Sequence, residues 1–313
     1  MSKSEIIARD VVRIPTGIAN AYIIGSPDNW VLIDAGTPGN KANIISAVTQ
    51  HMGANAMPRA ILLTHGHFDH SGSASALAEH WGVSIYAHRR ELPFVDGRSA
   101  YPPPDPTVGG FMSQVIRFIP NSKINLRPHL RELQVGPLPW LRNWQVIETP
   151  GHTAGHVSFF REQDGVVIAG DAFTTMNQDS MLGTLSRKQE VWRPPTYYTP
   201  DWQQARKSVA KLAALGPRVL AAGHGLPMSG WGALEQLRQL ATNFPIPEHG
   251  RYVNEPVRYY EGGIAYLPPP VPDPVKRTAV ITTAAAATIG AGLWLANRRT
   301  AEERRELERK PAA

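Results

Sequence analysis

The chain of 313 residues contains no cysteine. The sequence therefore excludes disulfide bonds, a thiolate nucleophile and any cysteine ligand to a metal ion. A metal site in this protein must be built from imidazole and carboxylate side chains, and the chain has 11 histidines and 26 acidic residues to supply them.

Uncompensated charge is also scarce outside the C-terminal tail. The formal net charge is +6 at pH 7. Eight Lys/Arg and four Glu follow position 275, so the tail carries +4 and residues 1–275 carry the remaining +2. A nearly neutral body does not favour a general nucleic-acid-binding surface, and we expect no nucleic-acid partner.

The N-terminal stretch MSKSEIIARDVVRI lacks the apolar segment that marks a secretory signal peptide. We therefore expect the main body of the chain to lie in the cytoplasm.

Short apolar runs alternate with segments of helical periodicity along most of the chain. The pattern predicts a hairpin at 20–36 and a strand–helix–strand order from 59 to 88, which indicates a layered α/β fold. The other predicted elements are helices at 39–53, 199–216 and 232–244 and strands at 144–150, 156–161, 166–171 and 218–225, with 71–82 as the helix of the strand–helix–strand unit.

Two stretches interrupt this rhythm. Residues 91–142 include YPPPDPTVGGF (101–111), whose prolines and glycines exclude a regular element, and residues 172–198 are irregular too. Loops of this length in compact domains are usually functional or disordered. We expect both stretches to lie near the site and to set its substrate.

Metal-capable side chains stand at the ends of the predicted strands. Strand ends in a layered α/β fold converge on one edge, where ligand sites lie. We expect the following residues to meet there: Asp34 after WVLI, His65, His67, Asp69 and His70 after AILLT, His152 in TPGHTAGH, Asp171 after VVIAG, and His224 after VLAAG.

This set is too large for one ion. With Asp34 set aside, the remaining candidate ligands exceed the four that a tetrahedral zinc ion accepts. Two ions roughly 3.5–4 Å apart would use them, with a carboxylate bridging the pair. Imidazole and carboxylate ligands suit Zn²⁺, with iron or manganese as alternatives. A water shared by two ions would lose a proton near neutral pH, because metal binding lowers its pKa from about 15.7 to roughly 7.

Four motifs, in this order, resemble those of the metallo-β-lactamase superfamily: THGHFDH (64–70), GHTAGH (151–156), GD (170–171) and GHG (223–225). The resemblance covers about residues 10–245 and implies an αββα sandwich. The ligand sets that it implies are His65, His67 and His152 for a first metal and Asp69, His70 and His224 for a second, with Asp171 bridging both.

The resemblance also implies roles around the ligands. In this family the aspartate after the first hairpin, here Asp34, supports the metal-binding loop and one ligand from behind. The form TPGHTAGH (149–156) is similar to glyoxalase II-like and lactonase-like members. A tyrosine near the metals polarises the substrate carbonyl in lactonase-like relatives, which makes Tyr197 and Tyr198 candidate substrate contacts.

The expected activity is hydrolysis of a small-molecule ester, thioester or lactone by a hydroxide bound to two zinc ions, with Asp69 and Asp171 as catalytic carboxylates. Two alternatives stay open. One is a persulfide dioxygenase-like iron enzyme, which shares most of the motif. The other is a metal-stabilised binding protein that catalyses nothing.

The chain has one long uncharged stretch, TAVITTAAAATIGAGLWLAN (278–297), which is long enough to cross a bilayer. We predict a transmembrane helix here that anchors a cytoplasmic catalytic domain to the membrane, with a membrane-surface or soluble helix as alternatives. Ala286 and Gly290 would allow close helix pairing, and so a homo-oligomer. The predicted domains are a catalytic domain at 1–245, a proline-rich linker at 246–275, and a tail at 276–313 with this single helix.

Overall fold

Two β-sheets lie at the centre of the fold. The structure is a computed structural model that describes residues 4–273 except 120 and 187. Nearly all of these residues belong to one compact unit, Met1–Pro270. The strands of the first sheet follow the order of the sequence: β1 (Glu5–Ala8), β2 (Val11–Pro15), β3 (Asn20–Ser26), β4 (Asn29–Ile33), β5 (Ile61–Leu62), β6 (Ile85–His88) and β7 (Leu130–Leu133). In the first sheet the pairs up to β3–β4 are antiparallel and those from β4 to β7 are parallel.

The strands of the second sheet, in spatial order, are β13 (Met228–Ser229), β12 (Val219–Ala221), β11 (Val166–Ile168), β10 (Val157–Arg161), β9 (Trp144–Glu148) and β8 (Gly136–Pro137). This sheet is antiparallel except for one parallel pair, β11 with β12.

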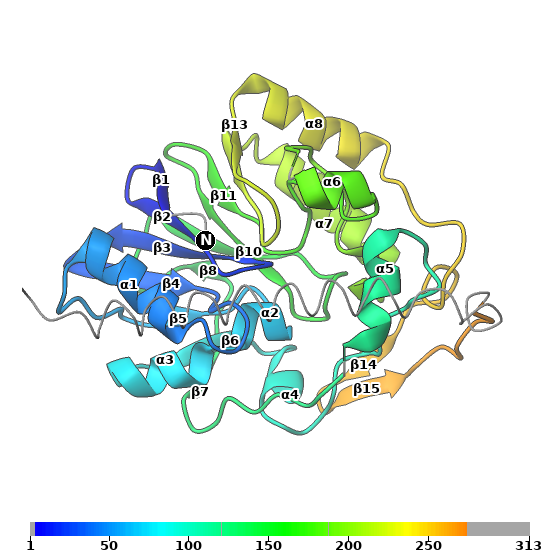
Figure 1. Cartoon of the computed structure of the whole chain (residues 1–313), viewed down its shortest axis with the longest axis horizontal. Helices are drawn as coiled ribbons and strands as arrows, with labels where there is room; N and C mark the ends of the chain where they lie inside the picture. The colour runs from blue at the N-terminus through cyan, green and yellow to red at the C-terminus, as the bar shows by residue number, and fades with distance from the viewer. Residues whose placement is uncertain (1–3, 120, 187, 274–313) are drawn as a thin grey trace, which may run out of the picture. The chain divides into compact units, whose positions relative to one another are not determined.

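Helices cover the outer face of each sheet (Figure 1). The first sheet packs against α1 (Lys41–Met52) and α3 (Ala74–Trp81), and the second against α7 (Trp202–Ala214) and α8 (Trp231–Thr242). The shorter helices are α2 (Phe68–Ser71), α4 (Leu92–Val95), α5 (Phe111–Val115), α6 (Met181–Ser186) and the 3-10 helices η1 (Ile116–Phe118) and η2 (Thr196–Tyr198).

The burial of strand β4 on both faces explains why its sequence is apolar throughout. Side chains alternate between the two faces of a strand. Val31 and Ile33 enter the core between the two sheets, whereas Trp30 and Leu32 enter the core under α1 and α3. A strand buried on both faces has no polar face, which explains the run WVLI. The layers confirm the αββα sandwich.

Two elements differ from the sequence prediction. The helix predicted at 71–82 corresponds to α3, which begins only at Ala74, and the separate short helix α2 ends at Ser71. Residues 258–266, predicted to lie in a linker, form the hairpin β14 (Arg258–Tyr260) and β15 (Gly263–Tyr266). Nearby, the buried Tyr252 donates a hydrogen bond from its hydroxyl to the carbonyl oxygen of Pro103 at 2.6 Å. This part of the proline-rich stretch is therefore folded onto the 91–142 insertion.

The prediction of a membrane anchor needs correction. Over residues 4–273, leaving aside 120 and 187, no helix is both long and apolar enough to cross a bilayer. The stretch 278–297, on which the prediction was placed, lies outside the described residues. Its seven alanines and four threonines contribute less to membrane insertion than leucine, isoleucine, phenylalanine or valine do. Both the transmembrane helix and the membrane-anchored location are dropped.

Candidate metal centre

The structure brings all seven predicted ligands together at one edge of the sandwich. Each is buried, with at most 7% of its surface exposed. His65 and His67 lie on the loop after β5, Asp69 and His70 on α2, His152 after β9, Asp171 after β11 and His224 after β12.

Strand register explains why two of these ligands meet. Ile168 at the end of β11 pairs in parallel with Ala221 at the end of β12. Asp171 and His224 each follow three residues later. Because parallel strands end at the same edge of a sheet, the equal offset places both side chains at the same height.

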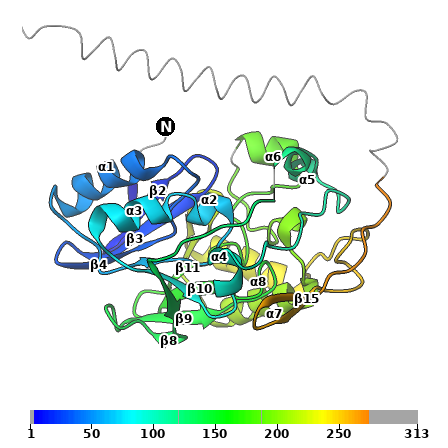
Figure 2. The same ribbon diagram turned by 90° about the horizontal axis from the view of Figure 1, so that it is seen from below.

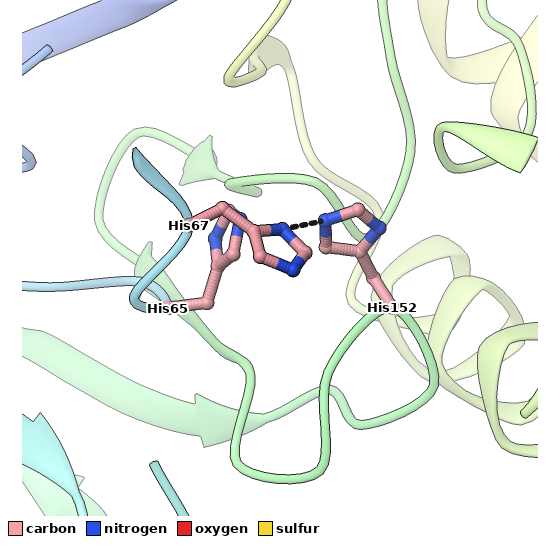
Figure 3. A group of neighbouring side chains, drawn as sticks. All are labelled: His65, His67 and His152. Carbon is pink, nitrogen blue, oxygen red and sulfur yellow. Dashed lines mark hydrogen bonds between the residues drawn. The ribbon is translucent and has the colours of Figure 1, made fainter. Parts of the chain in front are cut away.

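Three imidazoles form a first group, shown in Figure 3. His67 Nδ1 lies 3.0 Å from His152 Nε2, and the ring centroids of His65 and His152 are 4.8 Å apart. Potential ligand atoms of all three side chains lie within 4.8 Å of one another. Imidazole nitrogens at this spacing fit a single divalent ion.

Asp69, His70 and His224 form a second group, and Asp171 lies between the two. Asp171 Oδ1 is 3.5 Å from His70 Nε2 in the second group. Asp171 Oδ2 is 3.4 Å from His152 Nε2 in the first group and 3.2 Å from His224 Nε2 in the second. The carboxylate therefore presents oxygens to both groups.

Several buried atoms in this cluster lack a partner. Within the described part of the chain, His65 Nε2, His70 Nε2 and Asp171 Oδ1 make no hydrogen bond. A buried polar atom without a partner costs about 1–3 kcal/mol. Divalent cations would satisfy all three atoms, so the residues present fit the metal ions that the fold implies.

Burial and mutual charge shift the pKa values of these groups. Burial lowers the pKa of His67 to about 3, and it holds those of His65 and His152 well below the usual range. Burial also acts on His70 and His224, but the carboxylates beside them raise their pKa above the usual range. The first group is therefore neutral near pH 7, the form in which imidazole binds metals.

Asp34 supports the second group from behind. Its Oδ2 accepts a hydrogen bond from His70 Nδ1 at 2.8 Å, and its Oδ1 accepts one from the backbone N–H of Thr64 at 2.8 Å. The Thr64 hydroxyl donates to Asp34 Oδ2 and so accepts from His65 Nδ1 at 3.0 Å. In the neutral form that binds a metal, both imidazoles therefore carry their proton on Nδ1 and turn an unprotonated Nε2 toward the cluster.

His156 is buried in the same region, but both of its ring nitrogens have partners. Nε2 accepts from the backbone N–H of Asp171 at 2.9 Å, and Nδ1 is 2.8 Å from the Thr149 hydroxyl. The ring holds the backbone of Asp171 and has no free nitrogen for a metal.

The two predicted tyrosines lie beside the cluster on η2. The Tyr198 ring packs on the His67 ring with centroids 4.4 Å apart, and the Tyr197 hydroxyl contacts Gln178 Oε1 at 3.4 Å. Both line a cavity of about 210 Å³ that Asp69 and His224 also line. Burial raises the pKa of both phenols, so each keeps its proton.

Glu91, at the start of α4, is a residue of the site that the sequence did not reveal. Its side chain is 1% exposed. Oε2 accepts from the backbone N–H of Gly66 at 3.1 Å and from the Tyr101 hydroxyl. Oε1 accepts from the Thr153 hydroxyl at 2.7 Å and from the backbone N–H of Gly155 at 2.8 Å. Burial raises the pKa of this carboxyl, and the four hydrogen bonds oppose that shift.

Three of these four bonds connect the two histidine loops. Gly66 separates His65 from His67, and Thr153 directly follows His152. One buried carboxylate therefore fixes the distance between the two loops that supply the first group.

Comparisons with known proteins agree with this geometry. Residues 14–224 match the family model described as the metallo-beta-lactamase superfamily. The chain is 41% identical over 240 residues to the probable metallo-hydrolase YflN of Bacillus subtilis, covering 75% of this chain and 91% of that protein. It is 28% identical over 143 residues to the hydroxyacylglutathione hydrolase GloC of Haemophilus influenzae, covering 46% of this chain and 60% of that one.

Solved structures share the fold at lower identity. The metallo-beta-lactamase family protein TTHA1429 of Thermus thermophilus superposes with a TM-score of 0.53 at 22% identity, covering 76% of this chain and 80% of that one. Given the family match over residues 14–224, the four motifs and the αββα layers, this chain belongs to the metallo-β-lactamase superfamily.

Proposed function

We propose that the protein is a hydrolase that uses two divalent metal ions to cleave a small-molecule carboxyl ester, thioester or lactone. The observation that carries the proposal is the position of Asp171, whose two oxygens face two separate groups of ligands. The metallo-hydrolase name of the relative from Bacillus subtilis supports the reaction type, and the name of GloC supports a thioester as one candidate bond.

We assign the first ion to His65, His67 and His152 and the second to Asp69, His70 and His224, with Asp171 shared by both. Imidazole and carboxylate ligands suit zinc. Bound at this site, the two ions would polarise the substrate carbonyl and lower the pKa of the attacking water.

The protein's own groups hold this arrangement. Asp34 and the backbone carbonyl of Ile18 accept hydrogen bonds from Nδ1 of His70 and His224, at 2.8 Å in each case. These bonds fix the tautomer of each ring and direct its Nε2 into the site. Asp69 lines the cavity, so its carboxylate is placed to take the proton released by the attacking water.

Tyr197 and Tyr198 are the groups that we assign to the substrate. Both line the cavity at the metal end and keep their hydroxyl protons. A phenol O–H placed there would donate a hydrogen bond to the substrate's carbonyl oxygen, where negative charge develops as water adds.

Metal analysis combined with a substrate panel tests the proposal. The panel contains S-acyl glutathione, an acyl lactone, a simple carboxyl ester, a chromogenic lactam and a phosphodiester. We expect two divalent ions per chain and turnover of an ester, thioester or lactone that Asp69→Ala abolishes. Two bound ions without turnover would favour a metal-stabilised binding protein. One iron per chain with sulfite production would indicate a persulfide dioxygenase.

A further inference from the structure

Most of the lining of the cavity beside the metal cluster is apolar. Asp69, Tyr198 and His224 bring it next to the ligand groups. The lining also includes apolar side chains from α2, α5, η1 and the segments after η1, β11 and β12: Phe68, Met112, Ile116, Ile119, Met176 and Leu226.

An unpaired positive charge that could bind an anionic substrate group is missing from the described lining. Arg13 reaches the cavity, but its side chain is 5% exposed and already paired. Its Nη1 donates to Glu5 Oε1 at 2.7 Å and its Nε donates to Asn20 Oδ1 at 2.8 Å. A carboxylate-bearing leaving group or acyl group would find no unpaired cation among these residues.

The apolar character continues onto the surface at the cavity mouth. Ile18 lines the cavity and is 54% exposed, and Thr184 lines it from α6. The neighbours of Thr184 on that helix, Leu182 and Leu185, are 75% and 69% exposed. Exposed apolar side chains gathered at a pocket are typical of ligand-binding surfaces.

The helices α5 and α6 from the two insertions lie side by side here (Figures 1 and 2). The backbone N–H of Phe111 on α5 donates to the carbonyl oxygen of Asp179 at 2.8 Å, just before α6. The two stretches that interrupt the sequence pattern therefore form one wall together.

We propose that this cavity, which we call the acyl cavity, binds an aliphatic acyl chain. The proposal rests on the hydrolase function proposed above and names its substrate class. The preferred substrates are esters, thioesters or lactones with an apolar acyl group. Water adds to the carbonyl carbon and the acyl C–O or C–S bond breaks. An ester or thioester gives a carboxylic acid and an alcohol or thiol that takes up the proton, and a lactone gives a single hydroxy acid.

Burial of apolar surface sets the expected chain-length dependence. Each buried methylene contributes at most about 0.8 kcal/mol, which corresponds to about a fourfold gain in kcat/KM. For p-nitrophenyl esters from acetate to dodecanoate, hydrolysed by the full-length metal-loaded protein, kcat/KM should rise with each methylene until the acyl cavity is full and then level off.

Two substitutions, one in each inserted stretch, should narrow the acyl cavity. Met112→Trp on α5 and Thr184→Trp on α6 should each lower kcat/KM for the octanoate ester about tenfold, the loss of roughly two buried methylenes. The readout is the ratio of kcat/KM for the octanoate and acetate esters, which should fall because the acetate ester has the shorter acyl chain. Met57→Trp is the matched control, since Met57 is an exposed residue outside the cavity lining. Thermal melts of all variants show whether each is folded.

Binding without turnover separates this proposal from the proposed function. Calorimetric titration with octanoate and acetate should show tighter binding of octanoate, and both tryptophan variants should remove the difference. If no ester is cleaved but this binding pattern appears, the proposal that the cavity binds an acyl chain is supported and the hydrolase proposal fails. Suppose instead that esters are cleaved at rates independent of chain length, or that the folded Met112→Trp and Thr184→Trp variants behave like Met57→Trp. Either result overturns the proposal that the cavity binds an acyl chain and leaves the hydrolase proposal standing.

Discussion

The carboxylate of Asp34 accepts a hydrogen bond from Nδ1 of His70 at 2.8 Å, and both residues are almost completely buried. Asp34 has a φ of 58°, a left-handed conformation that is uncommon for a residue with a side chain. Backbone strain of this kind persists where the surroundings over-determine it, often at functional sites. Here it turns the carboxylate toward His70 and Thr64.

Asp34→Asn should therefore weaken metal binding without removing a ligand. An amide oxygen replaces only part of the acceptor capacity that His70 and Thr64 use. We expect metal affinity at the second group to fall about 10–100-fold, as measured by competition with a chelator. The exposed Asp28→Asn on the preceding turn is the control. Equal affinities in the two variants would mean that Asp34 does not act through His70.

Glu91→Gln should loosen the first ligand group. The substituted side chain has one acceptor oxygen and an NH₂ group, so it cannot accept from all four donors that face Glu91. We expect a destabilisation of about 1–3 kcal/mol and weaker metal retention under a chelator. Asp96→Asn is a matched control, because Asp96 is a buried carboxylate near α4 that pairs with Arg98 and Arg127. A variant that loses stability but keeps full metal affinity would assign Glu91 a purely structural role.

The two ligand groups should lose metal at different pH values. His65, His67 and His152 are neutral throughout the neutral range because burial depresses their pKa. His70 and His224 have raised pKa values, so in the metal-free protein they hold protons that a metal must displace. Affinity at the second group should therefore fall as the pH drops below these raised pKa values, which lie above the ordinary histidine value of about 6.5.

Dialysis at a series of pH values measures this difference. Metal per chain should fall from two ions to one as the solution becomes mildly acidic, and the second ion should leave only at lower pH. Loss of both ions in a single step would show that the two groups do not titrate separately.

Tyr198→Phe should slow catalysis while leaving the metals in place. The variant keeps the ring that packs on His67 and loses the hydroxyl assigned to the substrate carbonyl. Removal of one such donor costs about a hundredfold or more in kcat. Tyr86→Phe on β6, outside the cavity lining, provides the control. An unchanged kcat at unchanged metal content would leave Tyr198 a packing role only.

The clustering of the ligands could be predicted because each follows a short apolar strand. His65, Asp171 and His224 stand directly after such runs, and strand ends in a layered fold meet at one edge. The motifs then indicated the family. Local sequence carried this information because four of the seven candidate ligands lie within residues 65–70.

Glu91 could not be predicted because its partners are distant in the sequence. Gly66 and Thr153 lie 25 and 62 residues away from it. A charged residue just before the apolar stretch LPFV was the one local signal. The hairpin at 258–266 was missed for a similar reason, since the packing of Tyr252 on Pro103 spans 149 residues while the prolines around it indicate a linker.

The two-metal hydrolase is tested by the metal content of the purified full-length protein, measured together with ester hydrolysis. We expect two divalent ions per chain in the wild type. In Asp171→Ala we expect a loss of metal and a fall in turnover of at least about a hundredfold, because this carboxylate faces both ligand groups. A wild-type protein that is fully active with one ion per chain, or an Asp171→Ala variant that keeps both ions and full activity, would contradict it.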